Sequence, residues 1–383
     1  MGSELAPAEQ AVLLERHRPV LRFDPQYDYR VLAAESAVNN RGNILRRFDG
    51  ELIARAAGDP PLDINTLTRY PSGLRPRPDD CLAMAPDHPG DARRMEWEEA
   101  HRGRIYGRVV EDEGRIWLQY WFWLYYNPKN LLGFGKHEGD WEMIQVGLGA
   151  DRSPEVATYA QHDSGEARPW REDDMEFAPD DPLRPVVYIA PLSHASYFEP
   201  NSHPYFFGID HPYADGPVAG DLPVVPFGPW VDWEGRWGST ERTIGGRIGG
   251  GPRSPRRQNP KWERPGIWHR RMRHRRVRAL LGRTMHALGG LTYPHPPGIA
   301  ASPEAGTVSV RWELDGRGSR RGRHLYITLH ERHFVIASRI VEDAGRTGTT
   351  AFLVPAERRP TAVIASAYNR TRQRSDIARA TLE

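Results

Sequence analysis

The sequence has little that could cross-link or anchor it. Cys81 is the only cysteine among 383 residues, so no intramolecular disulfide can form and the fold must depend on packing. No apolar run approaches the roughly 18 residues that a membrane-spanning helix needs. The N-terminal segment lacks a basic region followed by an apolar region, so we expect no secretory signal peptide. These absences predict a cytoplasmic protein without a transmembrane segment.

An excess of charge of either sign is also missing. The 52 Lys and Arg residues nearly balance 50 Asp and Glu residues, for a formal net charge of +2. A near-neutral protein has no overall attraction to nucleic acid, and we expect no nucleic-acid partner. The local exception is an Arg-rich segment at 268–288, which we expect to form a helix ended by Gly289 and Gly290. Such a helix can grip phosphates, but we favour a solvated or domain-docking face.

Proline, glycine and tryptophan are plentiful, at 34, 37 and 12 residues, and this composition favours turns, loops and strands. Apart from the helices expected at 7–17 and 268–288, the patterned segments indicate strands. Residues 230–238 and 251–262 predict ordered loops clamped by aromatic side chains. The strands expected in the first half of the chain are Ile105 to Val110, Arg115 to Tyr126, Trp141 to Leu148, Val156 to His162 and Pro185 to Ala190.

The chain is too long for one ordinary core and predicts at least two domains. The Pro-rich segment 292–298 cannot continue a helix and marks the expected boundary. We therefore expect a helical lead-in at 1–18, a large β-sandwich with loop and helix insertions at 19–298, and a small β-sandwich at 299–383. The predicted fold class is mainly β.

The segment HEGDWE at 137–142 carries the clearest chemistry. Successive side chains of a strand point to opposite faces, so Asp140 and Glu142 share one face. The flexibility of Gly139 lets the chain fold His137 back toward the two carboxylates. One imidazole and two carboxylates form a three-ligand set for a divalent cation, and these donors favour Mg, Ca or Mn, with Zn as a further alternative. The alternative without a metal is a set of hydrogen-bonded, solvated side chains at a strand end.

An ordered series of motifs between residues 19 and 265 resembles the vacuolar protein sorting-associated protein 62 family. The motifs are PVLRFDPQYDY, QYWFWLYYN, HEGDWE, QHDSG, VVYIAPLSHASYF, and WEGRWG with the following GP…KW…P stretch. The H-x-x-D-W-E element also resembles the necrosis- and ethylene-inducing-peptide-like proteins, which are β-sandwiches that bind a divalent cation through this motif and an upstream Asp. The tail, with Trp312 early and Tyr368–Asn369 late, resembles a fibronectin type III domain.

These resemblances imply that His137, Asp140 and Glu142 are metal ligands and that Asn130 stands in place of the upstream Asp. An Asn offers an oxygen but no charge, which implies weaker cation affinity or a water as the fourth ligand. Gly139 stands where the toxins carry a second His, and its presence removes one acid–base group. The toxins are exported and carry disulfides, features that this sequence lacks, so an intracellular role is favoured.

Two further histidines fall in the matched motifs, His162 in QHDSG and His194 in SHAS. Both follow expected strands, and the ends of strands are where binding and catalytic residues gather. Each is a candidate acid–base group, and each is equally a candidate structural histidine that fixes a loop. Ser193 and His194 lack a G-x-S-x-G elbow, so we do not expect a serine hydrolase.

Three functions are compatible with the sequence. The first, which we favour, is recognition of a polar small molecule, a glycoconjugate or a lipid head group through the metal. The second is a metal-dependent hydrolase or biosynthetic enzyme that uses His162 or His194 as an acid–base group. The third is a structural protein whose cation only staples a loop. The sequence leaves the oligomeric state open.

Overall fold

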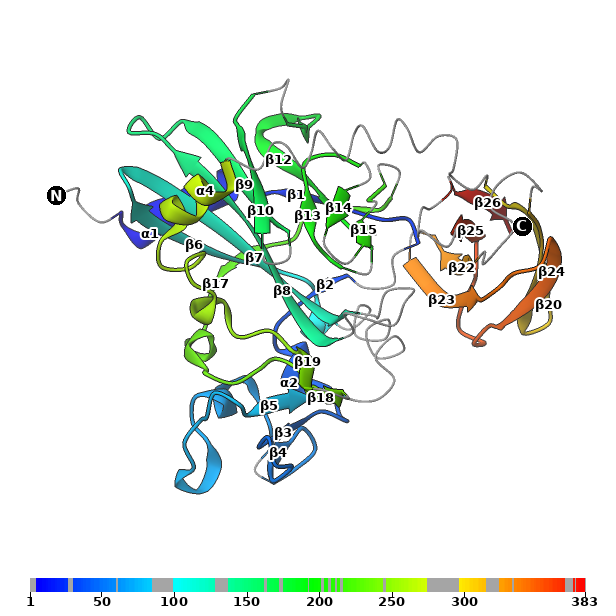
Figure 1. The fold of residues 1–383 in the computed structure, drawn as a ribbon, viewed down its shortest axis with the longest axis horizontal. Helices are drawn as coiled ribbons and strands as arrows, with labels where there is room; N and C mark the ends of the chain where they lie inside the picture. The colour runs from blue at the N-terminus through cyan, green and yellow to red at the C-terminus, as the bar shows by residue number, and fades with distance from the viewer. Residues whose placement is uncertain are drawn as a thin grey trace. The chain divides into compact units, whose positions relative to one another are not determined.

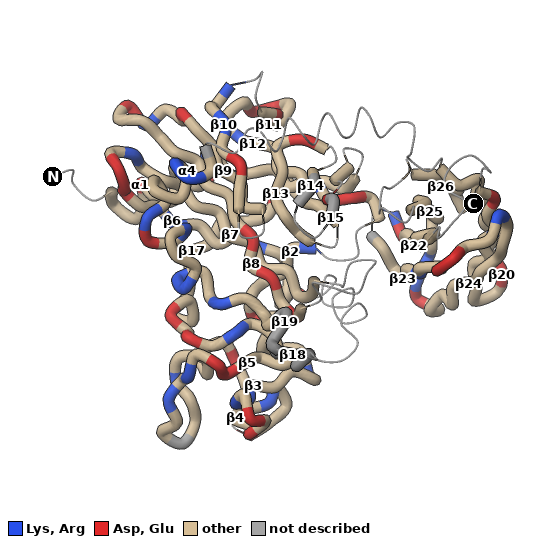
Figure 2. The backbone as a smooth tube through the Cα atoms, viewed as in Figure 1, with Lys and Arg blue, Asp and Glu red and all other residues tan. Residues whose placement is uncertain are grey.

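The structure is a computed structural model. The residues that it describes are 5–26, 30–59, 61–84, 99–127, 137–161, 164–171, 175–191, 193–200, 203–205, 208–210, 212–213, 216–243, 246–273, 296–314, 324–332, 334–368, 375 and 377–382. Across these ranges, no helix has both the length and the apolar character needed to cross a membrane. Basic and acidic positions are interspersed along the chain (Figure 2).

The chain divides into two compact units, and each is described by itself. The first comprises Met1–Arg22, Tyr29–Glu199 and Val218–Val277, and the second comprises Phe23–Asp28, Pro200–Pro217 and Arg278–Glu383. The domain limits expected from the sequence, 1–18, 19–298 and 299–383, stay a prediction.

Strands dominate the elements of the first unit (Figure 1). Its helices and strands, with β1 reaching the edge of the unit, are α1 (Pro7–Arg16), β1 (Val20–Phe23), β2 (Val31–Leu32), α2 (Ser36–Asn39), β3 (Ile44–Arg46), β4 (Leu52–Arg55), β5 (Cys81–Ala83), β6 (Ile105–Asp112), β7 (Arg115–Asn127), β8 (His137–Leu148), β9 (Pro154–Gln161), β10 (Ser164–Pro169), β11 (Phe177–Ala178), β12 (Asp181–Ile189), β13 (Ser196–Tyr197), β16 (Val218–Ala219), β17 (Val224–Pro226), β18 (Thr240–Thr243), β19 (Gly246–Gly250) and α4 (Pro265–Arg273). Single-turn 3-10 helices lie at Ile64–Leu67, Pro71–Gly73, Glu99–His101, Pro229–Asp232 and Pro255–Arg257.

Two main sheets build this unit. The larger has the order β10-β9-β8-β7-β6-β17 with β2 beside β7, and the smaller has the order β11-β12-β1-β16 with β13 beside β12. Tyr159 of β9 connects them. Its ring stacks on Phe198 with centroids 3.7 Å apart, and its hydroxyl donates to the carbonyl of Val186 at 3.0 Å. The predicted mainly β fold is confirmed, and its arrangement of sheets is that of a β-sandwich.

The strands nearest the candidate site form where the sequence predicts them. β6 and β7 are joined by a two-residue turn in which Glu113 has φ +53° and Gly114 has φ +74°. Two consecutive positive φ values are typical of the tight turns whose twist matches antiparallel strands. β7 then pairs with β8 along almost its full length, and the register sets Asn127 opposite His137. This pairing brings the end of β7 beside the HEGDWE segment.

Tryptophans cover one face of β7 and β8. The rings of Trp123 and Trp141 lie 5.1 Å apart, and Trp141 also contacts Trp237 at 5.4 Å and stacks on Trp230 at 5.6 Å. Trp230 and Trp237 come from one of the loops rich in Pro, Gly and Trp, and their burial fastens that loop to the sheet. Large aromatic groups supply much buried area and specific ring geometry. The prediction that aromatic residues clamp this loop is confirmed.

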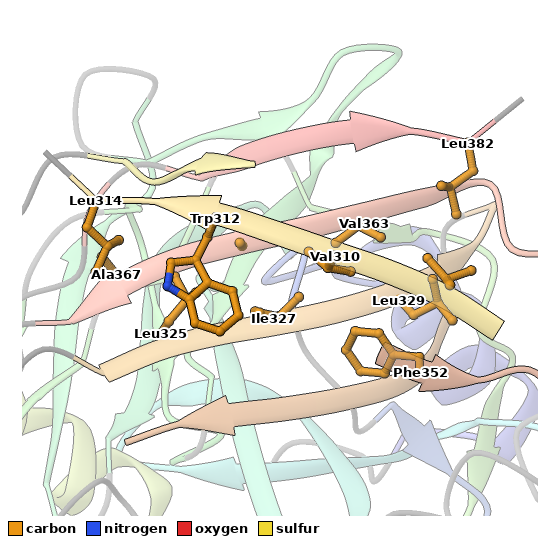
Figure 3. Close-up of a cluster of buried hydrophobic side chains, with 12 residues drawn as sticks. Val310, Trp312, Leu314, Leu325, Ile327, Leu329, Phe352, Val363, Ala367 and Leu382 are labelled. Atoms are coloured by element: carbon orange, nitrogen blue, oxygen red, sulfur yellow. The ribbon is translucent and has the colours of Figure 1, made fainter. Parts of the chain in front are cut away.

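The second unit contains a small sandwich of two sheets, β20-β21-β24 and β23-β22-β25-β26. The strands of the sandwich are β20 (Gly298–Glu304), β21 (Thr307–Glu313), β22 (His324–Glu331), β23 (Phe334–Val341), β24 (Thr347–Leu353), β25 (Ala362–Tyr368) and β26 (Ala378–Thr381). The unit also contains β14 (His203–Tyr205) and β15 (Gly208–Asp210), which pair with each other. Side chains of both sheets meet in one core, among them Val310, Trp312, Ile327, Phe352 and Val363 (Figure 3). The alternation of apolar and polar residues along these strands explains why one face of each sheet is buried.

Candidate functional site

β8 changes its surroundings along its length. β9 pairs with β8 in a register that starts at Ile144 opposite Tyr159 and runs toward Leu148. The earlier part of β8, which holds the HEGDWE segment, pairs with β7 on its other side. A pocket of about 900 Å³ adjoins this part of the strand. His137, Asp140 and Glu142 all line that pocket, so the structure brings the three predicted ligand residues of β8 together.

The ring of His137 is held in one orientation by its own strand. Its Nδ1 atom lies 2.7 Å from the carbonyl oxygen of Gly139. A carbonyl can only accept, so Nδ1 carries the hydrogen and Nε2 carries the lone pair. The Nε2 atom lies 3.1 Å from Nδ2 of Asn127. The tautomer is therefore the one in which Nε2 can bind a metal while Nδ1 donates to a backbone carbonyl.

Gly139 is required at its position by close packing. Its φ is +65°, a conformation that glycine adopts without strain. A Cβ atom added there would lie 2.1 Å from the carbonyl oxygen of Trp237 and 2.2 Å from the ring of Trp123. No side chain fits, which gives a physical reason for the missing histidine at this position.

Asp140 is buried, with 7% of its surface exposed. One carboxylate oxygen, Oδ2, accepts a hydrogen bond from Nδ1 of His194 at 2.9 Å and lies 3.4 Å from Nδ2 of Asn127. His194 is completely buried and has a positive φ of 59° in the turn after β12, where its backbone N–H donates to the carbonyl of Ala190. A buried carboxylate needs such donors, since an unpartnered buried charge is strongly unfavourable.

Asn127 is a site residue that sequence reasoning missed. Its side-chain amide lies between Nε2 of His137 and the carboxylate of Asp140, and it can donate a hydrogen to each. The signal that could have found it is its position at the end of the QYWFWLYYN motif, because antiparallel pairing of the two motifs sets it opposite His137. Its amide nitrogen now occupies the space to which both acceptors point.

The remaining predicted site residues have different outcomes. Asn130 and His162 lie outside the residues that the structure describes. Ser193 lines the pocket beside Asp140, and its hydroxyl accepts a long hydrogen bond from the backbone N–H of Ala195 at 3.4 Å. Glu138, which no sequence argument singled out, accepts hydrogen bonds from the backbone N–H groups of Met84 and Ser239 and so ties two loops to β8.

The donor set fits a divalent cation in its chemistry but is held as a hydrogen-bonded network. Across the described ranges of the chain, no three His, Cys, Asp or Glu side chains are arranged so that they could hold a metal ion. An imidazole nitrogen, two carboxylates and an amide that can turn its oxygen inward nevertheless line one pocket. Such a mixture of nitrogen and oxygen donors suits Mg, Ca, Mn or Zn.

Cationic side chains also line the pocket and form what we call its cationic wall, a feature that sequence reasoning did not connect with the site. Its positively charged members are Arg236, Arg253, Arg257, Lys261 and Arg271. Arg271 lies on α4, the described beginning of the predicted Arg-rich helix, whose residues from 274 onward lie outside the described ranges. Its neighbour Arg270 forms an ion pair with Glu113 at 2.7 Å. The helix therefore contributes one Arg to the pocket and one to an ion pair.

No protein-family model matches the sequence, and no curated protein matches it. Among solved structures, one similar protein is Necrosis and Ethylene inducing Protein 2 from the causal agent of cocoa's Witches Broom disease, at 16% identity and a TM-score of 0.28, covering 52% of this chain and 70% of that chain. Another is the non-toxic HaNLP3 protein, at 12% identity and a TM-score of 0.28, covering 59% and 75%. NLPPya in complex with glucosamine matches at 18% identity and a TM-score of 0.21, covering 25% of this chain and 45% of NLPPya. Scores this low describe partial likenesses to necrosis- and ethylene-inducing proteins and carry no argument about function.

Proposed function

We propose that this protein binds a polar small molecule, or the sugar-bearing head group of a glycoconjugate or lipid, in the pocket beside β8. A divalent cation held by His137, Asp140 and Glu142 would take part in this recognition. The observation that carries the proposal is that these three donors line one pocket of about 900 Å³. A cavity of this size lies in the range of small-molecule sites.

The cation would be Mg, Ca or Mn, with Zn as a further alternative. Hard cations bind oxygen donors, so it would supply an anchor for hydroxyl oxygens of the ligand. His137 is suited to hold it through Nε2, because its Nδ1–H already donates to Gly139. Asn127 is suited to rotate its amide and present an oxygen, and Asn130 remains a further candidate ligand. His194 would orient Asp140 through their hydrogen bond.

A second candidate function is a metal-dependent enzyme, a hydrolase or biosynthetic enzyme, that uses the same residues. The hydrogen bond between Asp140 and His194 favours it, since such pairs tune the groups that bind or activate a substrate. His194 is completely buried, so in this alternative it would act through Asp140, and His162 would be the acid–base group. A third candidate is a structural protein whose cation only staples a loop.

The finer family assignments belong with this proposal. We propose that the chain is related to the vacuolar protein sorting-associated protein 62 family through its ordered motifs. The strand order of the C-terminal sandwich, three strands against four, supports a fibronectin type III domain. A cytoplasmic location stays a prediction from the sequence.

The test begins with the metal. Elemental analysis of the purified protein should find about one divalent cation per chain, and Asp140→Asn should lose it. Equal metal in both proteins would contradict the site. Metal lost at unchanged thermal stability supports recognition or catalysis, whereas metal lost together with folding supports a staple.

The ligand is tested next with a panel of neutral monosaccharides. Saturation-transfer NMR should detect binding that a chelator abolishes and that Glu142→Gln weakens. Turnover of any glycoside or ester in a parallel screen, lost in His162→Ala, would favour the enzyme instead. If no monosaccharide binds, either with the cation or without it, recognition of a sugar is contradicted.

A further inference from the structure

Two chain segments supply four of the five positive charges of the cationic wall, and Arg271 of α4 supplies the fifth. Residues 252–261 supply three of its positive charges, and Arg236 lies beside them. Arg236 forms isolated bridges with both Cys81 and Arg253, so the small sheet of β3, β4 and β5 continues toward the pocket. The guanidinium groups of Arg236 and Arg253 therefore project from neighbouring, bridged backbone.

A buried tryptophan of a loop and a buried glutamine of β7 hold this backbone further. The Nε1–H of Trp237 donates to Ser254 at 2.8 Å, and Nε2 of Gln119 donates to the carbonyl of Lys261 at 2.7 Å. Both Trp237 and Gln119 are completely buried. Buried hydrogen bonds of this kind hold their partners in fixed positions. The wall is thus positioned before any ligand arrives.

Arg108 has a positioning role in the same wall. Its guanidinium lies 3.7 Å from the centroid of the Trp262 ring and donates to the carbonyl of Trp262 at 2.8 Å. Burial is the main cause that lowers the pKa of Arg108 to about 10, with a smaller effect from nearby Arg256. The group remains protonated at neutral pH and stays with its carbonyl and ring.

Not all of the positive charges are balanced by carboxylates. Arg257 forms an ion pair with Glu234 at 3.0 Å. Arg253 instead donates to the backbone carbonyl of Glu234 at 3.3 Å, which accepts a hydrogen bond but carries no charge. Arg271 is exposed, and it has no carboxylate partner among the described residues. Arg253 and Arg271, whose charges no carboxylate of the described residues balances in this way, thus line a pocket that Asp140 and Glu142 also line.

We propose that Arg253 and Arg271 form a subsite for a phosphoryl group, so that the ligand is a phosphorylated sugar or polyol. The planar guanidinium fork matches phosphate oxygens in two parallel hydrogen bonds. The hydroxyl groups of the same ligand then face the donors of β8. This inference rests on the proposed function, because it names the ligand class of the same pocket.

The test compares glucose with glucose 6-phosphate by isothermal titration calorimetry in the presence of Mg²⁺. The wild type should bind the phosphate ester at least about tenfold more tightly than glucose. Arg253→Ala and Arg271→Ala should each reduce that advantage about tenfold. Arg271 is exposed, so its variant keeps the test valid should the first variant fail to fold.

Arg256→Ala is the matched control. Arg256 belongs to the same segment, but it pairs with Asp232 at 2.5 Å and does not line the pocket. Its loss removes one positive charge from the surface and should leave the preference for the ester unchanged. An equal loss in Arg256→Ala would mean that overall charge, and not a subsite, attracts phosphate, and would overturn the proposal.

The remaining outcomes separate the subsite from the proposed function. Glucose bound as tightly as its phosphate overturns the subsite and leaves sugar recognition standing. Inorganic phosphate bound in an Arg253-dependent way, without any sugar binding, supports the subsite and contradicts the proposed function. Sedimentation with phosphatidylcholine vesicles that contain phosphatidylinositol, if it is lost in Arg271→Ala, supports the subsite and assigns the phosphoryl group to a lipid. Binding of the free ester alone also supports the subsite and assigns the phosphoryl group to a soluble ligand.

Discussion

The Nδ1 atom of His194 lies 2.9 Å from a carboxylate oxygen of Asp140, across 54 residues of sequence. Both side chains are buried, His194 completely. An ionised carboxylate in such surroundings needs hydrogen-bond donors, and the imidazole N–H provides one. The pair therefore fixes the position of one carboxylate oxygen, Oδ2, of Asp140.

Replacing His194 by Ala should destabilise the fold by about 2–3 kcal/mol. The variant leaves a cavity and removes a donor from a buried carboxylate. Urea unfolding followed by tryptophan fluorescence measures the loss. His194→Gln keeps an N–H donor and should recover part of it. Equal free energies of unfolding for the wild type and His194→Ala would contradict the structural importance of the pair.

Gly139→Ala should cost more than about 3 kcal/mol, because its Cβ would overlap the carbonyl of Trp237 and the ring of Trp123. Gly114→Ala is the matched control. Gly114 has a similar φ of +74°, but nothing lies within 4 Å of its added Cβ, so only backbone strain of about 1 kcal/mol applies. Thermal unfolding of both variants compares them. Similar melting temperatures would show that the overlap is relieved at little cost.

Asn127→Asp should make the site more dependent on a cation. The new carboxylate would lie beside Asp140, where Asn127 now lies 3.4 Å away, and like charges at this range repel. We expect a lower melting temperature in chelator, restored by Mn²⁺ or Ca²⁺, with cation affinity raised about tenfold. Differential scanning fluorimetry with and without metal measures both effects. An equal melting temperature of the variant with and without the cation would argue against a metal at this position.

The stability of the fold should fall in mild acid, partly through His17. Burial is the largest cause that lowers the pKa of His17 from its usual 6.5, although its hydrogen bond to the carbonyl of Leu183 opposes the shift. The unfolded chain then binds more protons than the folded chain below pH 6.5, so stability is present above that pH and is lost as the pH falls through the lower folded value. His17→Gln should show a shallower decline of unfolding free energy between neutral and acidic pH. An unchanged slope of unfolding free energy against pH would show that His17 does not contribute to the loss of stability in acid.

Local pattern was enough to predict the strands of the site. A run of aromatic and apolar residues identified β7, apolar residues identified β8, and the three residues that HEGDWE nominated, His137, Asp140 and Glu142, all line one pocket. Residues two apart on a strand share one face, so neighbouring sequence is enough to group them. Whether these residues hold a metal stays a prediction.

The rest of the site depends on contacts between distant segments. Asn127 joins the network only because β7 pairs with β8 in one register. Arg253 reaches the pocket because Trp237 holds Ser254, and nothing in the local sequence of either specifies that contact. Long-range packing of this kind has no periodic signature, so the cationic wall could not be predicted from the chain alone.

The packing over Gly139 also restricts how this protein can change over time. A side chain at position 139 and the present path of the backbone at Trp237 exclude each other. We therefore expect the two positions to vary together among homologous chains, with any larger residue at 139 accompanied by a displaced loop at 237. An added imidazole would in that case arrive together with a reshaped pocket, so ligand preference at this position would change in one step.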